Sequence, residues 1–380
     1  MTGSHLMARG QLGIARTMAT RKRIGILTSG GDCAGLNAVI RAVVFRAVHG
    51  HGWEVIGIRR GTLGLMTAPP DAIPLSLDMF SGEVLRMGGT LIGTTNRGDP
   101  FAFPMPDGST VNRSEEIYAG YRALGLDGLI VVGGDGSFRI LARLVAEGGL
   151  RVIGIPKTID NDVAHTENAI GYISAVNIAT EALDRLQTTA ASHSRIMILE
   201  VMGRDAGHIA LAAGIAGGAD IILIPEIPYT VDALARKIQE IETTWDRDFA
   251  LVVVAEGCKT EDGGAITIAD AQGRPRYGGI GHYLADHLAR ATGWESRFTI
   301  LGHVQRGGSP ATTDRVLGAA FGVRAVDLIN EQAFGRVVVW QNRRVADISL
   351  DEVAGIHRNV EVDGPLMGTA RGLGISFGDE

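Results

Sequence analysis

The chain has 380 residues, of which 45% are hydrophobic and 21% charged, and its formal net charge is −6. This length predicts about two to three domains, and the negative charge argues against general nucleic-acid binding. No apolar run approaches the ~18 residues that a membrane-spanning helix needs, so a soluble protein without a membrane partner is expected. The two cysteines, Cys33 and Cys258, have no metal-ligand or disulfide spacing, which favours a cytoplasmic protein.

Residues 1–17 contain Gly3, Ser4 and His5 but no apolar core of a signal peptide. We interpret this stretch as an expression tail, with Met18 as the natural start.

A first strand is predicted at residues 24–27, where a glycine-rich turn with Gly30 and Gly31 follows and apolar residues then recur at helical spacing. Glycines after a strand and before a helix form a phosphate-loop pattern. The spacing differs from the dinucleotide-binding fingerprint, so this turn taken alone also fits an ordinary strand-to-helix connection. The loop at residues 88–99, with Arg97 and Gly98, offers a cation for a phosphate, or is a surface loop with a solvated arginine.

The most informative turn follows the apolar run at residues 129–132 and contains Gly134, Asp135, Gly136 and Ser137. Glycines let a phosphate chain approach the backbone, and a helix that starts near Ser137 points free N–H groups at that anion. A carboxylate at Asp135 would repel the phosphate unless a cation lay between them, so Mg²⁺ is expected there.

A second acidic turn, which contains Lys157, Thr158 and Asp160, follows the predicted strand at residues 152–155. Ligands of open parallel sheets bind at the carboxyl ends of the strands, where both turns should lie. Each turn alone also fits a tight connection or a helix cap. Together, one strand apart, they favour a functional site.

Arg195 and Arg204 flank a strand predicted at residues 196–201, so they should lie roughly 30 Å apart at a strand's rise of ~3.3 Å per residue. One pocket in a single subunit can hardly hold both. If both arginines bind anions, an oligomer interface is implied.

Later strands are predicted at residues 221–224, 251–255 and 298–301. Glu256 ends the second of these, and His303 and Arg306 follow the third among glycines that suit phosphate recognition. The alternation of strands and helices from residue 24 to about 328 predicts an α/β fold: two doubly wound lobes with mainly parallel sheets and an active-site cleft between them.

Taken together, five sequence blocks resemble the 6-phosphofructokinase family, in the family's order and over about residues 23–314. They are TSGGD at 28–32, GGDGS at 133–137, PKTIDND at 156–162, MGR at 202–204 and GHVQRGGSP at 302–310. The resemblance implies a glycolytic kinase that transfers a phosphoryl group from ATP, with Mg²⁺, to the 1-hydroxyl of fructose 6-phosphate.

The resemblance also implies roles for single residues. Asp160 would be the base, Thr158 would lie near the transferred group, Arg204 would assist catalysis, and Asp135 would hold the metal. The phosphate donor would be bound by Gly30, Gly31, Arg97, Gly98, Gly134, Asp135, Gly136 and Ser137. The sugar phosphate would be bound by Thr158, Asp160, Met202, Gly203, Arg204, Glu256, His303 and Arg306, and by Arg195 and Arg297 of a neighbouring subunit.

A homodimer or homotetramer with shared sites is therefore expected. The donor lobe would comprise residues 18–172 and about 305–355, and the sugar-phosphate lobe residues 173–304 and about 356–380. Asn96 is the alternative to Arg97 for the donor-loop role.

Two positions bear on the identity of the phosphate donor, and they favour different donors. Gly136 leaves open the space where pyrophosphate-using relatives carry an aspartate, whereas Lys157 replaces a glycine of the bacterial ATP enzymes and resembles the pyrophosphate-using ones. We predict ATP, with a pyrophosphate-dependent enzyme as the alternative. A different kinase with a similar glycine-rich turn would lack the block at 302–310. A sugar-phosphate sensor without catalysis would have no use for Asp160 as a proton acceptor.

Overall fold

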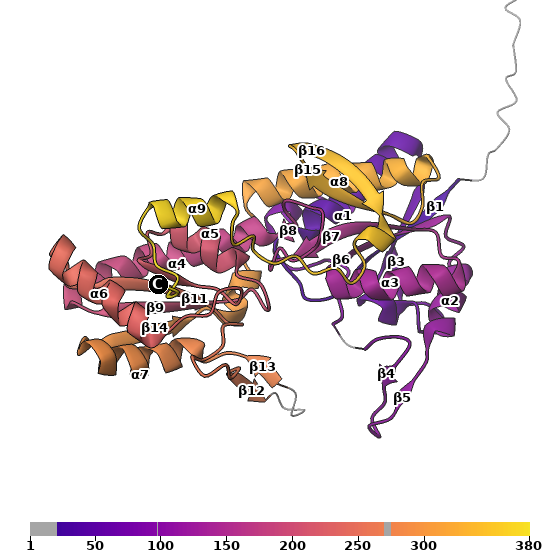
Figure 1. The fold of residues 1–380 in the computed structure, drawn as a ribbon. Helices are drawn as coiled ribbons and strands as arrows, with labels where there is room; N and C mark the ends of the chain where they lie inside the picture. Colours follow the sequence, from indigo (N-terminus) through magenta and orange to yellow (C-terminus); the bar gives the residue numbers. More distant parts are fainter. Residues whose placement is uncertain (1–20, 97, 270–274) are drawn as a thin grey trace, which may run out of the picture.

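The computed structural model describes residues 21–96, 98–269 and 275–380, which form two α/β lobes side by side (Figure 1). Residues 1–17 and Arg97, for which a tail and a donor contact are expected, lie outside the described residues.

The first lobe is built on a sheet in the order β16-β15-β7-β6-β1-β2-β3, with β8 beside β7. Its parallel centre consists of β15, β7, β6, β1 and β2, and its two edge strands run antiparallel. The strands are β1 (Arg23–Thr28), β2 (Glu54–Ile58), β3 (Ala72–Leu75), β6 (Gly128–Gly133), β7 (Val152–Thr158), β8 (Ile170–Gly171), β15 (Arg336–Gln341) and β16 (Arg344–Ser349).

Helices cover both faces of this sheet, because its central strands carry apolar side chains on both faces. In β6, Ile130 and Val132 belong to one hydrophobic cluster, and Leu129 and Val131 belong to another. The first cluster contains α1 (Leu36–Val44) and α8 (Thr312–Asn330), and the second contains α2 (Ser114–Ala123) and α3 (Asp135–Gly148). Strands that are buried on both faces are typical of a parallel sheet.

The second lobe is a four-stranded parallel sheet in the order β10-β11-β9-β14. Figure 1 shows α4 and α5 on one side of it and α6 and α7 on the other. Its elements are α4 (Tyr172–His193), β9 (Ile196–Val201), α5 (His208–Ala216), β10 (Ile221–Leu223), α6 (Val231–Trp245), β11 (Ala250–Ala255), α7 (Ile280–Thr292) and β14 (Ser296–Ile300). Two short hairpins project from the lobes: β4 (Phe103–Pro104) with β5 (Thr110–Val111), and β12 (Thr267–Ala269) with β13 (Pro275–Tyr277).

The chain crosses between the lobes more than once. After β14 it returns through α8 to the first lobe, where α8 packs on α1 and β15 and β16 extend the first sheet. It then crosses back to α9 (Pro365–Gly372), which packs on α5, and Ser376 forms a bridge with Ile221 at the edge of the second sheet.

The α/β fold with mainly parallel sheets is confirmed. The β15–β16 hairpin was not predicted from the sequence. At its tip, Asn342 and Arg343 have φ angles of 50° and 61°, as a two-residue hairpin turn requires. Within residues 21–96, 98–269 and 275–380, no helix is long and apolar enough to cross a membrane.

Candidate active site

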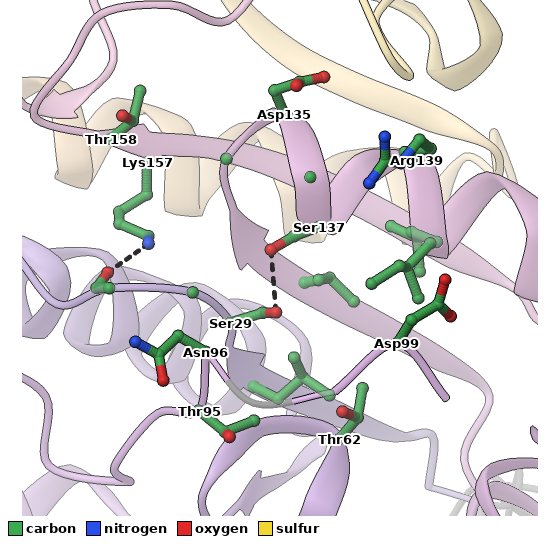
Figure 2. Close-up of a pocket in the computed structure, with 18 of the residues that line it drawn as sticks. Ser29, Thr62, Thr95, Asn96, Asp99, Asp135, Ser137, Arg139, Lys157 and Thr158 are labelled. Carbon is green, nitrogen blue, oxygen red and sulfur yellow. Dashed lines mark hydrogen bonds between the residues drawn. The ribbon is translucent and has the colours of Figure 1, made fainter. Parts of the chain in front are cut away.

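A cleft of about 530 Å³ opens where β1, β6 and β7 end. These strands are neighbours in the parallel sheet, so the turns that follow them meet at one edge. The turns that follow β9 and β14 add Arg204 and Arg306 to the lining. Figure 2 shows side chains of the first lobe around this cleft.

The two glycine-rich turns lie against each other. The Ser137 hydroxyl donates a hydrogen bond to Ser29 Oγ at 2.9 Å, which joins the turn after β6 to the turn after β1 (Figure 2). Gly30 has a φ angle of 83°, and its N–H donates to Thr95 O. A β-carbon at Gly31 would lie 2.1 Å from Arg306 Nη1, so glycine there allows the guanidinium to enter the cleft.

Asp135 is the first residue of α3, and it lines the cleft together with Gly134 and Gly136. Its Oδ1 atom is buried and has no hydrogen-bond partner among the described residues. A buried carboxylate oxygen without a donor fits a hard cation such as Mg²⁺, which prefers oxygen ligands. Mg²⁺ is commonly bound by one or two carboxylates together with phosphate oxygens and water, so a single carboxylate fits such a site.

Asp160 projects from the turn after β7, where its N–H donates to Thr158 Oγ1 at 3.1 Å. Its Oδ1 atom is also buried and has no partner among the described residues. Burial and, to a smaller extent, the nearby Asp162 carboxylate raise the pKa of Asp160 to about 6, against the opposing charge of Arg306. A carboxylate with a pKa close to neutrality is suited to accept a proton.

Lys157 is 3% exposed and lies one residue before Thr158. Its ammonium donates a hydrogen bond to Gly31 O at 2.5 Å (Figure 2), and burial lowers its pKa. The lysine therefore joins the turn after β7 to the first glycine-rich turn through a backbone carbonyl.

Arg204 follows β9 in a left-handed conformation with a φ angle of 55°. Its N–H donates to Glu256 Oε1 at 3.2 Å, and its guanidinium lies 3.5 Å from Asp205. Burial raises the pKa of Glu256 to about 7. The N–H of Met202 donates to Oε1 of the buried Gln305, which joins the segment of Met202 and Gly203 to the segment of His303 and Arg306.

Of the residues proposed from the sequence, the cleft is lined by Gly30, Gly31, Gly98, Gly134, Asp135, Gly136, Ser137, Lys157, Thr158, Asp160, Arg204 and Arg306. Met202, Gly203, Glu256 and His303 do not line it but lie in the turns that carry Arg204 and Arg306 or contact them.

Arg195 and Arg297 lie elsewhere. They occupy the amino ends of the parallel strands β9 and β14, opposite the end that Arg204 follows. Both form ion pairs with Glu295, at 2.7 Å for Arg195. Within one chain the structure therefore does not bring these two arginines to the cleft.

The cleft residues that were not predicted from the sequence include Thr62, Asp99 and Arg139 (Figure 2). Arg139 follows Gly136 by three residues on α3, and this spacing places two residues on the same helix face. That spacing is a signal the sequence contained. Thr62 lies in the short 3₁₀ helix Gly61–Gly64 after β2 and carried no local signal.

A sequence model described as Phosphofructokinase matches residues 23–329. The ATP-dependent 6-phosphofructokinase 1 of Synechocystis sp. is 57% identical, over 96% of this chain and 100% of the relative. The protein of that name from Nostoc sp. is 56% identical, over 95% of this chain and 100% of the relative.

Among solved structures, phosphofructokinase from Pichia pastoris in the T-state superimposes with a TM-score of 0.76 at 32% identity; the match covers 88% of this chain but only 35% of the yeast chain. A pyrophosphate-dependent phosphofructokinase from Marinobacter aquaeolei has a TM-score of 0.74 over 93% of this chain and 88% of its own, at 20% identity, which is a likeness of fold alone. With the turns and the cleft described above, these matches show that the chain belongs to the phosphofructokinase family.

Proposed function

We propose that this chain transfers the terminal phosphoryl group of ATP to the 1-hydroxyl of D-fructose 6-phosphate, giving fructose 1,6-bisphosphate, a reaction of glycolysis. The observation that carries the assignment is the buried Asp160 carboxylate, whose pKa is close to neutrality and which shares one cleft with two glycine-rich turns. Relatives that are 56–57% identical over nearly the whole chain are named ATP-dependent 6-phosphofructokinases.

The residues divide into a donor side and an acceptor side. On the donor side, Gly30, Gly31, Gly98 and the amino end of α3 accommodate the phosphates, and Asp135 holds Mg²⁺. The metal neutralises charge on the phosphate oxygens when it is bound. On the acceptor side, Asp160 takes the proton of the sugar hydroxyl, Thr158 lies beside the transferred group, and Arg204 faces them across the cleft.

The sugar phosphate is held by charge and by hydroxyl acceptors. Arg306 enters the cleft over Gly31, and its Nε atom is buried without a partner among the described residues. A phosphate would satisfy this donor, since arginine binds phosphate through its fork of N–H groups. Glu256, beside Arg204, would accept from a sugar hydroxyl, and Met202, Gly203 and His303 would complete the pocket.

The activity should fall below about pH 6. Asp160 must be ionised to accept a proton, and its raised pKa of about 6 means that it is protonated below that pH. The measurement is kcat/KM for fructose 6-phosphate from pH 5 to 9 at saturating ATP. Asp162→Asn removes the neighbouring negative charge, so it should shift the acid limb to lower pH. An acid limb that stays in place in this variant would contradict the assignment of the limb to Asp160.

The site also requires a second subunit. Arg195 and Arg297 pair with Glu295 at the far end of the second sheet, so they can reach a sugar phosphate only in the cleft of a neighbouring copy. We expect a homodimer or homotetramer with shared sites, formed along the exposed edge strand β14, where Phe298 and Ile300 are exposed.

Arg297→Ala should raise KM for fructose 6-phosphate about tenfold or more and leave kcat within about threefold, because a charged hydrogen bond contributes roughly 1.5–3 kcal/mol. Arg185→Ala, on the exposed face of α4 beside Glu181, is the matched control. Co-expressing Arg297→Ala with Asp160→Asn should restore a normal KM, because each mixed dimer contains one intact site. Failure of this complementation would mean that Arg297 does not act across an interface.

The function itself is tested by one assay of fructose 1,6-bisphosphate formation, with ATP and with pyrophosphate side by side. We expect turnover with ATP and little with pyrophosphate. Preference for pyrophosphate would favour a pyrophosphate-dependent fructose 6-phosphate 1-phosphotransferase. Binding of the sugar phosphate without turnover on either donor would favour a sensor that uses the same fold.

Two further assignments accompany this proposal. Residues 18–172 and about 305–355 form the donor lobe and residues 173–304 and about 356–380 the sugar-phosphate lobe, which is supported by the joining of β15 and β16 to the first sheet and of Ser376 to the second. Both cysteines are free thiols, which supports a reducing, cytoplasmic location.

A further inference from the structure

Residues 357–360 form a crossing segment that leaves the first lobe after β16 and leads to α9 of the second lobe. On its way it runs beside the turn that carries Asp160. The backbone of the crossing segment bonds to that turn directly, since the N–H of Arg358 donates to Asp162 O at 2.8 Å and His357 forms a bridge with Val163.

The guanidinium of Arg358 binds the back of the same turn. Nε and Nη2 donate to the carbonyl of Asn161 at 3.1 and 2.8 Å, and Nη1 donates to Thr166 O at 2.6 Å. Nη2 also lies 3.4 Å from Glu167 O. One side chain thus donates hydrogen bonds to the carbonyls of three residues that lie within seven positions of Asp160.

These contacts hold a backbone conformation that is unfavourable by itself. Asn161, directly after Asp160, has a φ angle of 56°, and such left-handed residues persist only where the surroundings hold them. The Asn161 side chain contributes as well, because it donates to Glu167 O at 3.0 Å and accepts from the N–H of Ala169 at 2.9 Å. The Asp160 carboxylate has a buried oxygen without a partner, so its direction depends on the backbone that Arg358 holds.

The other side of the crossing segment is anchored in the second lobe. His208 Nε2 donates to Arg358 O at 3.1 Å; burial lowers the pKa of His208 to about 4, so this imidazole is neutral at physiological pH. Glu226 Oε1 accepts from the N–H of Val360 at 2.8 Å and from the N–H of Gly207 at 3.0 Å, and Gly207 ends the loop that starts with Arg204. The crossing segment therefore connects the turn of Asp160 to the loop of Arg204.

We propose that Arg358 is a positioning residue for phosphoryl transfer. It holds the turn of Asp160 so that the Asp160 carboxylate points at the hydroxyl of the sugar bound by the second lobe. This inference rests on the proposed function, in which Asp160 is the base. Arginine suits the task because its planar fork donates to several carbonyls at once, whereas the three N–H donors of a lysine ammonium all lie on one nitrogen and span a smaller distance.

Arg358→Met and Arg358→Lys test the role. We expect Arg358→Met to lower kcat about 10²-fold, because a displacement of about 1 Å at a reacting group costs that much, while KM for ATP and for fructose 6-phosphate stays within about threefold. Arg358→Lys should retain an intermediate kcat. It also carries the test if Arg358→Met does not fold. All assays are made well below the unfolding midpoint of each variant, so that only folded enzyme is compared.

Arg324→Met is the matched control. Arg324, on α8, pairs with Asp347 and Glu331 and has no contact with the catalytic turn. This variant should lose thermal stability and keep kcat. A kcat of Arg358→Met within twofold of the Arg324→Met value would overturn the inference and leave Arg358 with a structural role only.

A double variant separates this inference from the proposed function. If Arg358 acts through Asp160, Arg358→Met should cost less than about threefold in kcat once Asp160→Asn has removed the base. Multiplicative losses would overturn the positioning role. A near-normal kcat of Asp160→Asn alone would instead refute the assignment of the base, and the loss in Arg358→Met would then need another cause.

Discussion

Asp160→Asn is expected to lower kcat by about 10²- to 10⁴-fold while fructose 6-phosphate still binds, since this is the usual contribution of a general base. Asn has nearly the same size as Asp, so the turn and its bond to Thr158 Oγ1 should persist. The measurements are steady-state kcat with ATP and calorimetric binding of fructose 6-phosphate. A kcat close to that of the unmodified enzyme would show that another group accepts the proton.

The same variant should be more stable, which separates loss of catalysis from loss of folding. The pKa of Asp160 is raised from 3.8 to about 6 in the folded chain, so below about pH 3.8 the carboxyl is neutral in both states and costs nothing. Between about pH 3.8 and 6 the unfolded state ionises while the folded state keeps the proton, so the folded state loses up to about 3 kcal/mol of stability, and this loss is complete above about pH 6. Asn carries no such cost.

Thermal unfolding should therefore show Asp160→Asn several degrees above the unmodified protein at pH 8, and little difference at pH 3.5. Equal midpoints at pH 8 would indicate that folding does not destabilise the ionised Asp160 carboxylate, which would contradict its raised pKa.

Gly136→Asp is expected to lower kcat/KM for ATP by about 10²- to 10³-fold. A β-carbon at Gly136 would meet no atom within 4 Å, so the backbone of α3 accommodates a side chain there. The cost is then electrostatic: a second carboxylate beside Asp135 faces the phosphates of ATP, and like charges in contact cost several kcal/mol. We therefore expect the open position at Gly136 to be what allows the unmodified enzyme to use ATP.

Gly136→Asn is the matched control, because it has the size of Asp without the charge, and it should keep ATP use within about tenfold. Measuring both donors in each variant also tests Lys157. If Gly136→Asp loses ATP without gaining pyrophosphate, the ammonium held by Gly31 O is insufficient to switch the donor. Equal losses in the Asn and Asp variants would make space, and not charge, the determinant.

The sequence by itself determined the features that depend on neighbouring residues. The turns at Gly134 and at Asp160 were predicted because glycines and acidic residues directly follow apolar strands, and the edge at which they meet follows from the parallel order of strands. The separation of Arg195 from Arg204 was likewise predicted from the rise of one strand.

The tertiary structure alone decided the contacts between distant segments. Lys157 reaches Gly31 O across 126 positions, Arg358 reaches Asn161 O across 197, and Gln305 reaches the N–H of Met202 across 103. The hydrogen-bond partners of buried polar groups depend on which segments the two sheets and the crossing segment bring together. Residue spacing along the chain does not predict these contacts. The raised pKa of Asp160 has the same origin, because its burial, which raises the pKa, and the charges of Arg204 and Arg306, which partly oppose that rise, arise only when the lobes pack.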